Sequence, residues 1–280
     1  MLNGSDVVYS YDGTLCGLLC CVYESFYGKN IPCRIISDGE NDSLFKDELL
    51  IESNPEKAER VLRGIYKKIG ENAAYWVKNS IFSCHPEKEL LVIKFLELGF
   101  KVGKNVTKML HEQPVRDLQK AVNRIFREAH LLKGFTRFSD VGGNLVAVIE
   151  PKNLVLPLLA EHFVSRYPSE NFLIYDKTYK IALVYENRKS KIISVDGFEI
   201  PDADETEEKY RRLWKNFYDT VGIDQRYNPK CRMNLMPKYF WKNMTEFQTP
   251  AEEHQRQSLH ALLENGDKKQ LENSASPALT

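Results

Sequence analysis

Residues 134–150 read GFTRFSDVGGNLVAVIE, and the periodicity of the chain changes within this stretch. Before Gly134 the apolar residues recur with helical spacing, whereas after it they alternate with polar residues, as they do in strands. Two strands are predicted here, Phe135–Ser139 and Asn144–Glu150, joined by a hairpin turn at Gly142-Gly143 because both glycines accept positive φ angles. The change of period predicts an α+β protein, in which a helical middle region packs with an antiparallel sheet.

The helical region extends from about residue 55 to residue 132. Asn54 is a suitable N-cap for its first helix, and Pro55 is a suitable first residue. We expect four helices, at about 55–70, 72–83, 87–112 and 115–132. A break in the third helix would fall near Gly99 and Gly103.

Further strands follow the hairpin. After a helix over 154–167, β-rich runs with short polar turns predict an antiparallel meander. Its strands are Phe172–Tyr175, Ile181–Tyr185 and Ile192–Val195. Two more helices are expected, at about 204–221 and 237–244.

The N-terminal residues predict a short strand-helix unit. A strand over 6–10 leads through the turn Tyr11-Asp12-Gly13-Thr14 into a helix over Leu15–Phe26, which should be buried because its apolar residues run nearly all round it. Two more strands, Ile31–Ser37 and Glu48–Glu52, either join the antiparallel sheet or form a small sheet of their own.

Length and composition predict an ordinary folded protein. The 280 residues are 42% apolar and 28% charged, enough to bury a sizeable core. We expect one α+β domain over 1–246, with a helical part at about 55–132 and a sheet part at about 134–245, followed by a polar, flexible tail over 247–280. No apolar run approaches the ~20 residues that span a bilayer, and the N-terminus lacks the positive charge of a secretory signal, so a cytoplasmic location is expected.

The cysteines give no metal pattern. Cys16, Cys20 and Cys21 lack the paired spacing of a zinc ribbon and the three spaced thiolates of an iron–sulfur site. We interpret them as reduced, small buried residues on a helix. No metal and no cofactor are predicted, and neither a phosphate-binding loop nor a dinucleotide motif is present.

Charge is distributed unevenly although the formal net charge is zero. Residues 56–138 carry a net charge of +8 and residues 206–245 a net charge of +5, between acidic blocks. In the first block, basic residues share one face of the helix predicted at 115–132, and a second set lies on the helix before it. They are Arg116, Lys120, Arg124 and Arg127, and Lys101, Lys104 and Lys108. Two such stripes favour contact with a phosphate backbone, although solvated helix faces have the same pattern.

The second basic block mixes cations with aromatic residues. This mixture suits the stacking of unpaired bases beside phosphate contacts, but it also occurs in ordinary cores. The candidates for nucleic-acid contact are Arg226, Tyr227, Lys238, Tyr239 and Trp241.

A catalytic alternative rests on His130. This residue precedes several cations that should lower its pKa and leave it usable as a base, and Glu150 could orient it. Asp12 follows a strand, where it either caps a helix or binds a cation or a base edge. Arg137 and His162 would line the same cleft. A histidine near a helix C-terminus is also favoured by the helix dipole without any catalytic role.

Four segments of the sequence resemble a bacterial family known as a probable DNA metabolism protein, typically encoded beside a radical-SAM protein that is a putative DNA modification or repair enzyme. The segments are Tyr11-Asp12-Gly13-Thr14 with Gly17-Leu18-Leu19; His130 through Phe135 to Arg137-Phe138; Ile149-Glu150-Pro151 with Leu156-Pro157-Leu158-Leu159-Ala160, His162-Phe163 and Arg166-Tyr167-Pro168; and Asn228-Pro229 with Met236-Pro237-Lys238-Tyr239-Phe240-Trp241 and Glu246. In related, longer proteins a region like this one precedes a uracil-DNA glycosylase domain, but no glycosylase activity is carried over here. The resemblance implies the radical-SAM partner.

Two functional hypotheses follow. In the first, the chain is a DNA-metabolism accessory protein that binds nucleic acid through its basic helix faces and works with the radical-SAM partner in DNA modification or repair. In the second, it is an enzyme that acts on nucleic acid with His130 as general base. The supply of cations and the lack of a recognisable nucleophile favour the first hypothesis.

Overall fold

The computed structural model describes residues 3–4, 6–37, 48–198, 205–221, 223, 226 and 228–247. The chain divides into two compact units, Met1–Gly134 with Ile149–Gly197, and Phe135–Val148 with Phe198–Thr280. A single domain over 1–246 stays a prediction, and the tail predicted at 247–280 lies, apart from Phe247, outside the described residues.

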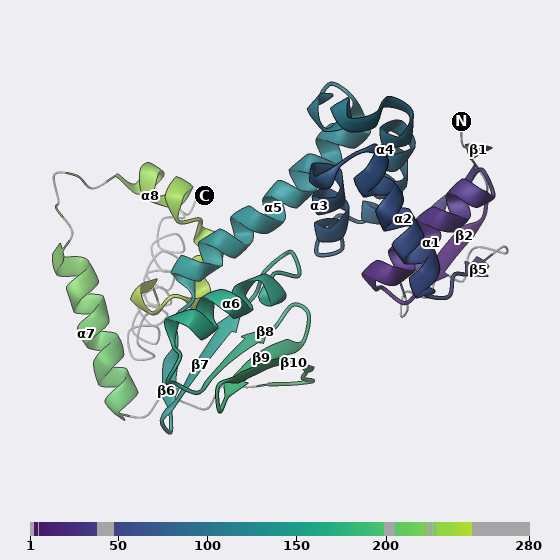
Figure 1. Ribbon diagram of the computed structural model, residues 1–280. Coiled ribbons are helices and arrows are strands. Elements are labelled where there is room, and N and C mark those ends of the chain that lie inside the picture. The colour runs from purple at the N-terminus through teal and green to yellow at the C-terminus, as the bar shows by residue number, and fades with distance from the viewer. Residues whose placement is uncertain are drawn as a thin grey trace, which may run out of the picture. The chain divides into compact units, whose positions relative to one another are not determined.

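The first unit begins with a small parallel sheet (Figure 1). Strand β2 (Val8–Tyr11) lies between β4 (Arg34–Ser37) and β5 (Glu48–Leu50) and runs parallel to both. Helix α1 (Leu15–Tyr27) provides the crossover that parallel pairing of β2 and β4 requires. The N-terminal strands therefore form a sheet of their own, which was one of the two predicted alternatives.

Two short strands, β1 (Asn3–Gly4) and β3 (Asn30–Ile31), form a separate parallel pair. The burial of α1 is confirmed, because Leu18, Leu19, Cys20 and Cys21 are all buried.

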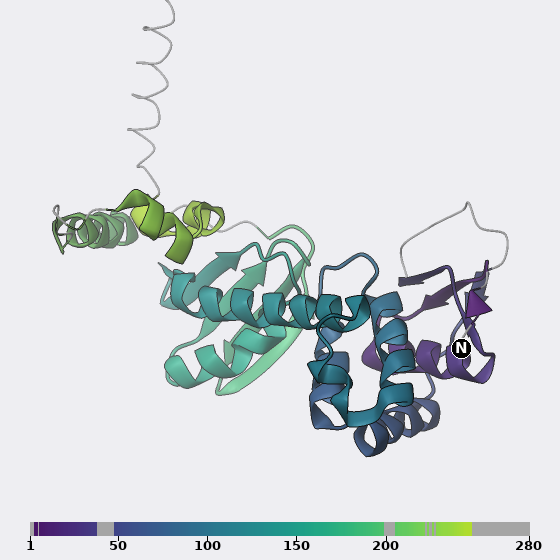
Figure 2. The ribbon, with the colours of Figure 1, turned by 90° about the horizontal axis from the view of Figure 1, so that it is seen from above.

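Four helices and a 3₁₀ turn complete the helical region. They are α2 (Pro55–Lys68), α3 (Glu71–Ser80), α4 (Lys88–Val102), η1 (Gly103–Lys108) and α5 (Gln113–Phe135). Helix α2 begins as predicted, with Asn54 Oδ1 accepting the amides of Glu56 and Lys57 at 2.9 and 3.1 Å. Helices α1 to α4 pack together around a core that includes Ile65 and Phe95 (Figure 2). The helix predicted at 87–112 breaks where expected, near Gly103, because the chain changes there from α to 3₁₀ geometry.

The predicted meander is confirmed in the same unit. Strands β8 (Phe172–Asp176), β9 (Ile181–Glu186) and β10 (Lys189–Ser194) pair antiparallel in sequence order. Helix α6 (Leu156–Arg166) packs on β9 and β10 and buries Leu159 and Phe163.

The second unit contains the hairpin of β6 (Ser139–Val141) and β7 (Asn144–Ile149). Its turn is the predicted one, since Gly142 and Gly143 have φ angles of 59° and 82°. The strand predicted at 135–139 is displaced, because α5 continues to Phe135 and β6 begins only at Ser139.

The other described elements of this unit are helical. It comprises α7 (Glu205–Val221), α8 (Pro229–Leu235), η3 (Lys238–Asn243) and η4 (Thr245–Phe247), and η4 packs on α7. Helix α8 was not predicted. It is nevertheless locally encoded, because Asn228 Oδ1 accepts the Cys231 amide at 3.0 Å and Pro229 occupies the first turn. The fold class is α+β, as the sequence predicts.

Candidate functional site

The turn between β2 and α1 places Asp12 at the carboxyl edge of the parallel sheet. Gly13 has a φ of 71°, which a glycine adopts readily. Gly17 packs so closely on the turn that a Cβ there would lie 2.3 Å from Asp12 Oδ1 and 2.8 Å from Tyr11 Cδ2. The turn motif is therefore explained by geometry, since both glycines are needed to bring α1 against the end of β2.

Asp12 connects the ends of β2 and β5. Its Oδ1 accepts hydrogen bonds from the Thr14 amide at 2.9 Å and the Thr14 hydroxyl at 2.7 Å, and its Oδ2 accepts one from Ser53 Oγ at 2.6 Å. Thr14 Oγ1 in turn accepts the Gly17 amide at 3.0 Å and so caps α1. Burial alone would raise the pKa of Asp12, but the hydrogen bonds from Ser53 and Thr14 outweigh it and hold the pKa below its ordinary value. Asp12 is thus an exposed, ionised carboxylate whose described hydrogen bonds stabilise the turn.

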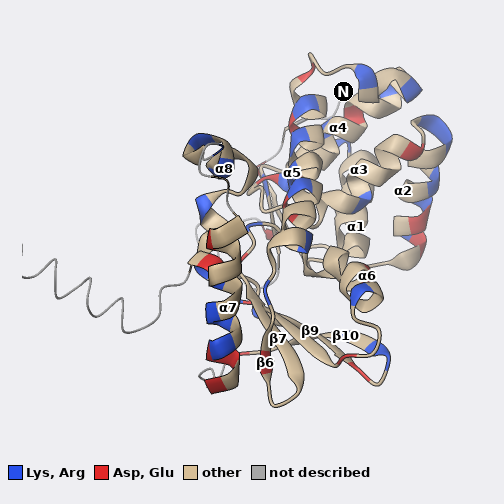
Figure 3. Ribbon diagram, turned by 90° about the vertical axis from the view of Figure 1, so that its left-hand side faces the viewer, with Lys and Arg blue, Asp and Glu red and all other residues tan. Residues whose placement is uncertain are grey.

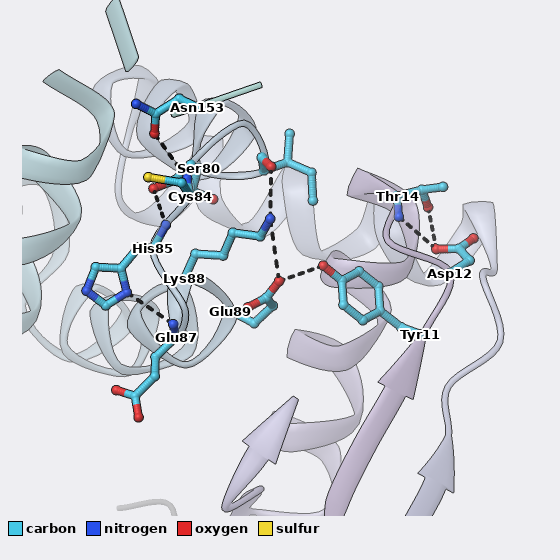
Figure 4. A network of polar contacts seen from close by, with 12 residues as sticks. Tyr11, Asp12, Thr14, Ser80, Cys84, His85, Glu87, Lys88, Glu89 and Asn153 are labelled. Atoms are coloured by element: carbon cyan, nitrogen blue, oxygen red, sulfur yellow. Dashed lines mark hydrogen bonds and ion pairs between the residues drawn. The ribbon is translucent and has the colours of Figure 1, made fainter. Parts of the chain in front are cut away.

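Tyr11 connects the sheet to α4 (Figure 4). Its hydroxyl donates a hydrogen bond to Glu89 Oε1 at 2.8 Å, and both residues are buried. The Nζ of Lys88 lies 3.9 Å from the same carboxylate oxygen and donates to the Ile81 carbonyl. Burial, followed by the charge of Glu89, raises the pKa of Tyr11, so the phenol stays protonated and acts as the donor.

Three of the four cations predicted to share one face of α5 are exposed. Lys and Arg recur along this helix in Figure 3. Lys120, Arg124 and Arg127 are exposed, and no hydrogen bond or ion pair of their side chains is found among the described residues. Arg116 is half-buried and lies 3.7 Å from Asp117. The opposite side of the helix is buried, as Leu118, Val122, Ile125, Ala129 and Leu132 show. We call Lys120, Arg124 and Arg127 the basic face.

The second predicted stripe does not form on one helix. Lys101 ends α4 and pairs with Glu97 at 2.8 Å, whereas Lys104 and Lys108 lie on η1. Residues four apart point in different directions in a 3₁₀ helix, which has three residues per turn. Lys104 and Lys108 are both exposed, but they lie on a different helix from Lys101.

The candidate catalytic residues lie on different elements of the structure. His130 is exposed one turn after Arg127, and Glu150 is half-buried just after β7. His162, on α6, makes a hydrogen bond to the backbone of Lys133. Burial, and then the charges of Lys133 and Arg166, lower the pKa of His162. The partners of Asp12 come instead from the N-terminal sheet.

Arg137 belongs to a partly buried ion-pair network in the second unit. Its Nε and Nη2 donate to the two oxygens of Glu246 at 3.1 and 2.7 Å, and Trp214 Nε1 donates to the same carboxylate at 3.1 Å. Burial alone would raise the pKa of Glu246, but the hydrogen bonds and charge of Arg137, helped by Trp214, hold it below its ordinary value. Arg137 therefore has a structural partner that its neighbours in the sequence did not reveal.

The aromatic residues of the second basic block are partly engaged within the unit. Trp241 stacks on Phe247 with ring centroids 4.4 Å apart, while Arg232 lies over its ring at 5.1 Å. Tyr239 is exposed, and Lys242 lies over its ring. Arg226 and Lys238 are exposed, whereas Tyr227 lies outside the described residues.

Helix α7 exposes its apolar side. Tyr210, Leu213 and Phe217 are more than half exposed, at 63, 53 and 56%. Its other side is held by polar contacts, because Glu207 accepts from Arg211 Nε at 2.8 Å and from the Asp140 amide at 3.2 Å.

The thiols are all free. Cys20 and Cys21 are buried, which raises the pKa of each thiol, and Cys20 Sγ accepts the Asn54 amide at 3.2 Å. Across the described ranges, no group of three or more His, Cys, Asp or Glu residues could hold a metal ion. None of the described helices has the length and apolar character to span a membrane.

Sequence reasoning missed three polar residues that join distant segments. They are Glu89, Glu128 and Asn153. Each is buried or half-buried and bonded to residues far away in the chain, so a local pattern carries no signal for it.

The fold and the basic face define an α+β protein with a small parallel sheet, a helical region and an exposed cationic helix. The model of the family described as a domain of unknown function, DUF4130, matches residues 86–246, more than half of the chain. The chain belongs to this family. No curated protein and no solved structure gives a significant match.

Proposed function

We propose that this protein is a DNA-metabolism accessory protein that binds nucleic acid through the basic face of α5 and works with a radical-SAM partner in DNA modification or repair. The observation that carries the nucleic-acid part is the exposure of Lys120, Arg124 and Arg127 without any ion pair among the described residues. Cations that no carboxylate neutralises are available to replace the counterions of a phosphate backbone.

The spacing of the basic face supports the same proposal. Lys120 and Arg127 are seven residues apart, or about 10 Å along the helix axis. One strand of a B-form duplex places about three phosphates over that length. Three cations therefore face a comparable number of phosphates, and the buried side of α5 holds the helix in place behind them.

A triple variant, Lys120→Gln, Arg124→Gln and Arg127→Gln, tests the proposal. Glutamine is nearly as good a helix former as lysine or arginine, so the helix should be preserved. Loss of three phosphate contacts would weaken affinity on the order of 100- to 500-fold at 0.1 M salt, if the affinity extrapolated to 1 M salt is unchanged. Fluorescence anisotropy with labelled single- and double-stranded oligonucleotides measures this loss.

Helix α2 provides a matched control. Three cations of this helix are exposed and are spaced much like those of the basic face. They are Arg60, Arg63 and Lys67, so the set again has two arginines and one lysine. Replacing them by glutamine changes the net charge equally. We expect the α2 variant to bind like the parent. Equal losses of affinity in both variants would show that only the overall charge matters, which would contradict a specific role for α5.

The radical-SAM partner is supported by the family resemblance alone. A direct test mixes the purified chain with a radical-SAM protein of the kind that the resemblance implies and measures co-elution in gel filtration, with and without DNA. We expect a shared peak, and separate peaks under both conditions would remove the partner from the proposal.

A second candidate function is an enzyme acting on nucleic acid with His130 as general base. It is favoured by the position of His130, exposed one turn beyond Arg127 on α5. Incubation of DNA with the parent and with a His130→Gln variant, followed by mass spectrometry of the nucleosides, tests it. Base changes made only by the parent would support catalysis, and unchanged DNA with the parent would oppose it.

A further inference from the structure

A buried carboxyl group ends strand β8 in the first unit. Asp176 is fully buried, and its Oδ1 accepts the amides of Thr178 and Tyr179 at 2.9 and 3.1 Å. Its Oδ2 is also buried but has no hydrogen-bond partner among the described residues. Burying an ionised carboxylate with one oxygen unsatisfied costs free energy, so the ionised form of Asp176 is unfavourable here.

The turn that Asp176 shapes docks on the segment before α6. The Lys177 amide donates to the Ile149 carbonyl at 3.0 Å, and Tyr179 Oη donates to the Lys152 carbonyl at 2.7 Å. The residues that directly follow Asp176 therefore donate the hydrogen bonds within the turn and those that join the turn to this segment. Because Asp176 organises the turn, a change in its charge should change how tightly the turn docks on this segment.

Glu128 of α5 holds the same segment from another side. Its Oε1 accepts the Lys152 amide at 2.7 Å, and its Oε2 accepts the amide and the side-chain nitrogen of Asn153 at 2.9 and 2.6 Å. These three hydrogen bonds fix the position of the Glu128 carboxylate against this segment. The negative charge of Glu128 acts on Asp176 and disfavours a second negative charge there.

We propose that Asp176 is a proton-binding site: it carries a proton while the β8–β9 turn is docked, and loss of that proton loosens the turn from residues 149–153. Protonation removes the buried charge. It also leaves Oδ1 free to accept the Thr178 and Tyr179 amides as observed. The proton itself moves to and from solvent when the turn opens.

The electrostatics of the junction support this assignment. Burial raises the pKa of Asp176 to about 6, the turn amides oppose this shift, and the charge of Glu128 adds to it. The side chains of Lys152, Lys177 and Lys180 are exposed. Because the pKa is higher when the turn is docked than when it is open, docking weakens as pH rises from about 4 to about 6 and is constant above that range.

Two measurements on the full-length chain test the proposal. The first is a carbon-13 NMR titration of the Asp176 carboxyl in the parent, for which we expect a midpoint near pH 6. The second is hydrogen exchange of the Lys177–Tyr179 amides, corrected for intrinsic rates. We expect the opening equilibrium constant to increase about tenfold between pH 5 and pH 8, as the shift from 3.8 to about 6 requires.

Substitutions assign the effect to this group. Asp176→Asn retains an acceptor for the turn amides but cannot titrate, so the tenfold increase should disappear. Asp140→Asn is the matched control, because Asp140 accepts the Gly143 amide in the β6–β7 hairpin but is exposed. The Asp140→Asn variant should retain the tenfold increase in the opening equilibrium constant. An Asp176 midpoint near 4 in the parent, or a tenfold increase that persists in Asp176→Asn, would overturn the proposal.

Discussion

The hydroxyl of Tyr11 donates a 2.8 Å hydrogen bond to Oε1 of Glu89, which joins the last residue of β2 to the first turn of α4. Glu89 lies within the stretch matched to the DUF4130 family, and Tyr11 lies before it. Hydrogen bonds to charged groups contribute about 1.5–3 kcal/mol, more than neutral ones. The N-terminal sheet is therefore attached to the family region by a polar contact as well as by apolar packing.

Removing this hydroxyl should destabilise the protein. Tyr11→Phe leaves the buried Glu89 without one of its donors, and we expect the free energy of unfolding to fall by about 1.5–3 kcal/mol. Urea denaturation followed by circular dichroism measures the change. Tyr27→Phe is the control, because Tyr27 is 78% exposed and its substitution should cost less than about 0.5 kcal/mol. Similar values for the two variants would show that the Tyr11 contact contributes nothing particular.

Gly17 should not tolerate a methyl group. Its Cβ would meet Asp12 Oδ1 at 2.3 Å and Tyr11 Cδ2 at 2.8 Å, so α1 or the turn would have to shift. We expect Gly17→Ala to cost about 1–3 kcal/mol, despite the better helix propensity of alanine. Gly64→Ala on α2 is the comparison, because its nearest contact would be Phe100 at 3.8 Å. That variant should be stabilised by up to about 1 kcal/mol in thermal unfolding, and a stabilised Gly17→Ala would contradict the close approach.

Acid should weaken the network around Glu246. Because its pKa is lower in the folded chain than the ordinary value of 4.5, ionised Glu246 stabilises the fold. That contribution is complete above about pH 4.5 and is lost as pH falls through the lower folded pKa. The fluorescence of Trp214, which donates to Glu246, should report the loss.

Glu246→Gln should destabilise the second unit at neutral pH and flatten this acid dependence. Removing one partner of a buried pair costs about 3–5 kcal/mol, and we expect less here because the Arg137 side chain is 24% exposed. Glu205→Gln, an exposed substitution on α7, is the control. An acid transition that is unchanged in Glu246→Gln would assign the titration to another group.

Local chemistry explains which elements the sequence could predict. The start of α2 follows from Asn54 and Pro55, and the β6–β7 turn follows from Gly142 and Gly143. Each depends on residues within one turn of the backbone. The parallel pairing of β2 with β4 and β5 was not predicted, because it depends on residues tens of positions apart and leaves no local signature.

The residues of the candidate site likewise differ in whether local sequence could predict them. Helical periodicity predicted the basic face of α5, since one helix sets both its exposed and its buried side. It failed for Lys101, Lys104 and Lys108, because the backbone changes to 3₁₀ geometry after Val102. The contact between Asp12 and Ser53, 41 residues apart, could not be derived from spacing.

The most direct test of the account is the salt dependence of oligonucleotide binding by the parent and by the Lys120, Arg124 and Arg127 triple glutamine variant. Each lost phosphate contact should reduce the slope of log affinity against log salt concentration by about 0.7–0.9. We therefore expect the variant's slope to be smaller than the parent's by about two to three, with equal effects across sequences. Identical slopes for parent and variant, or no binding by the parent, would contradict a nucleic-acid-binding role for the basic face of α5.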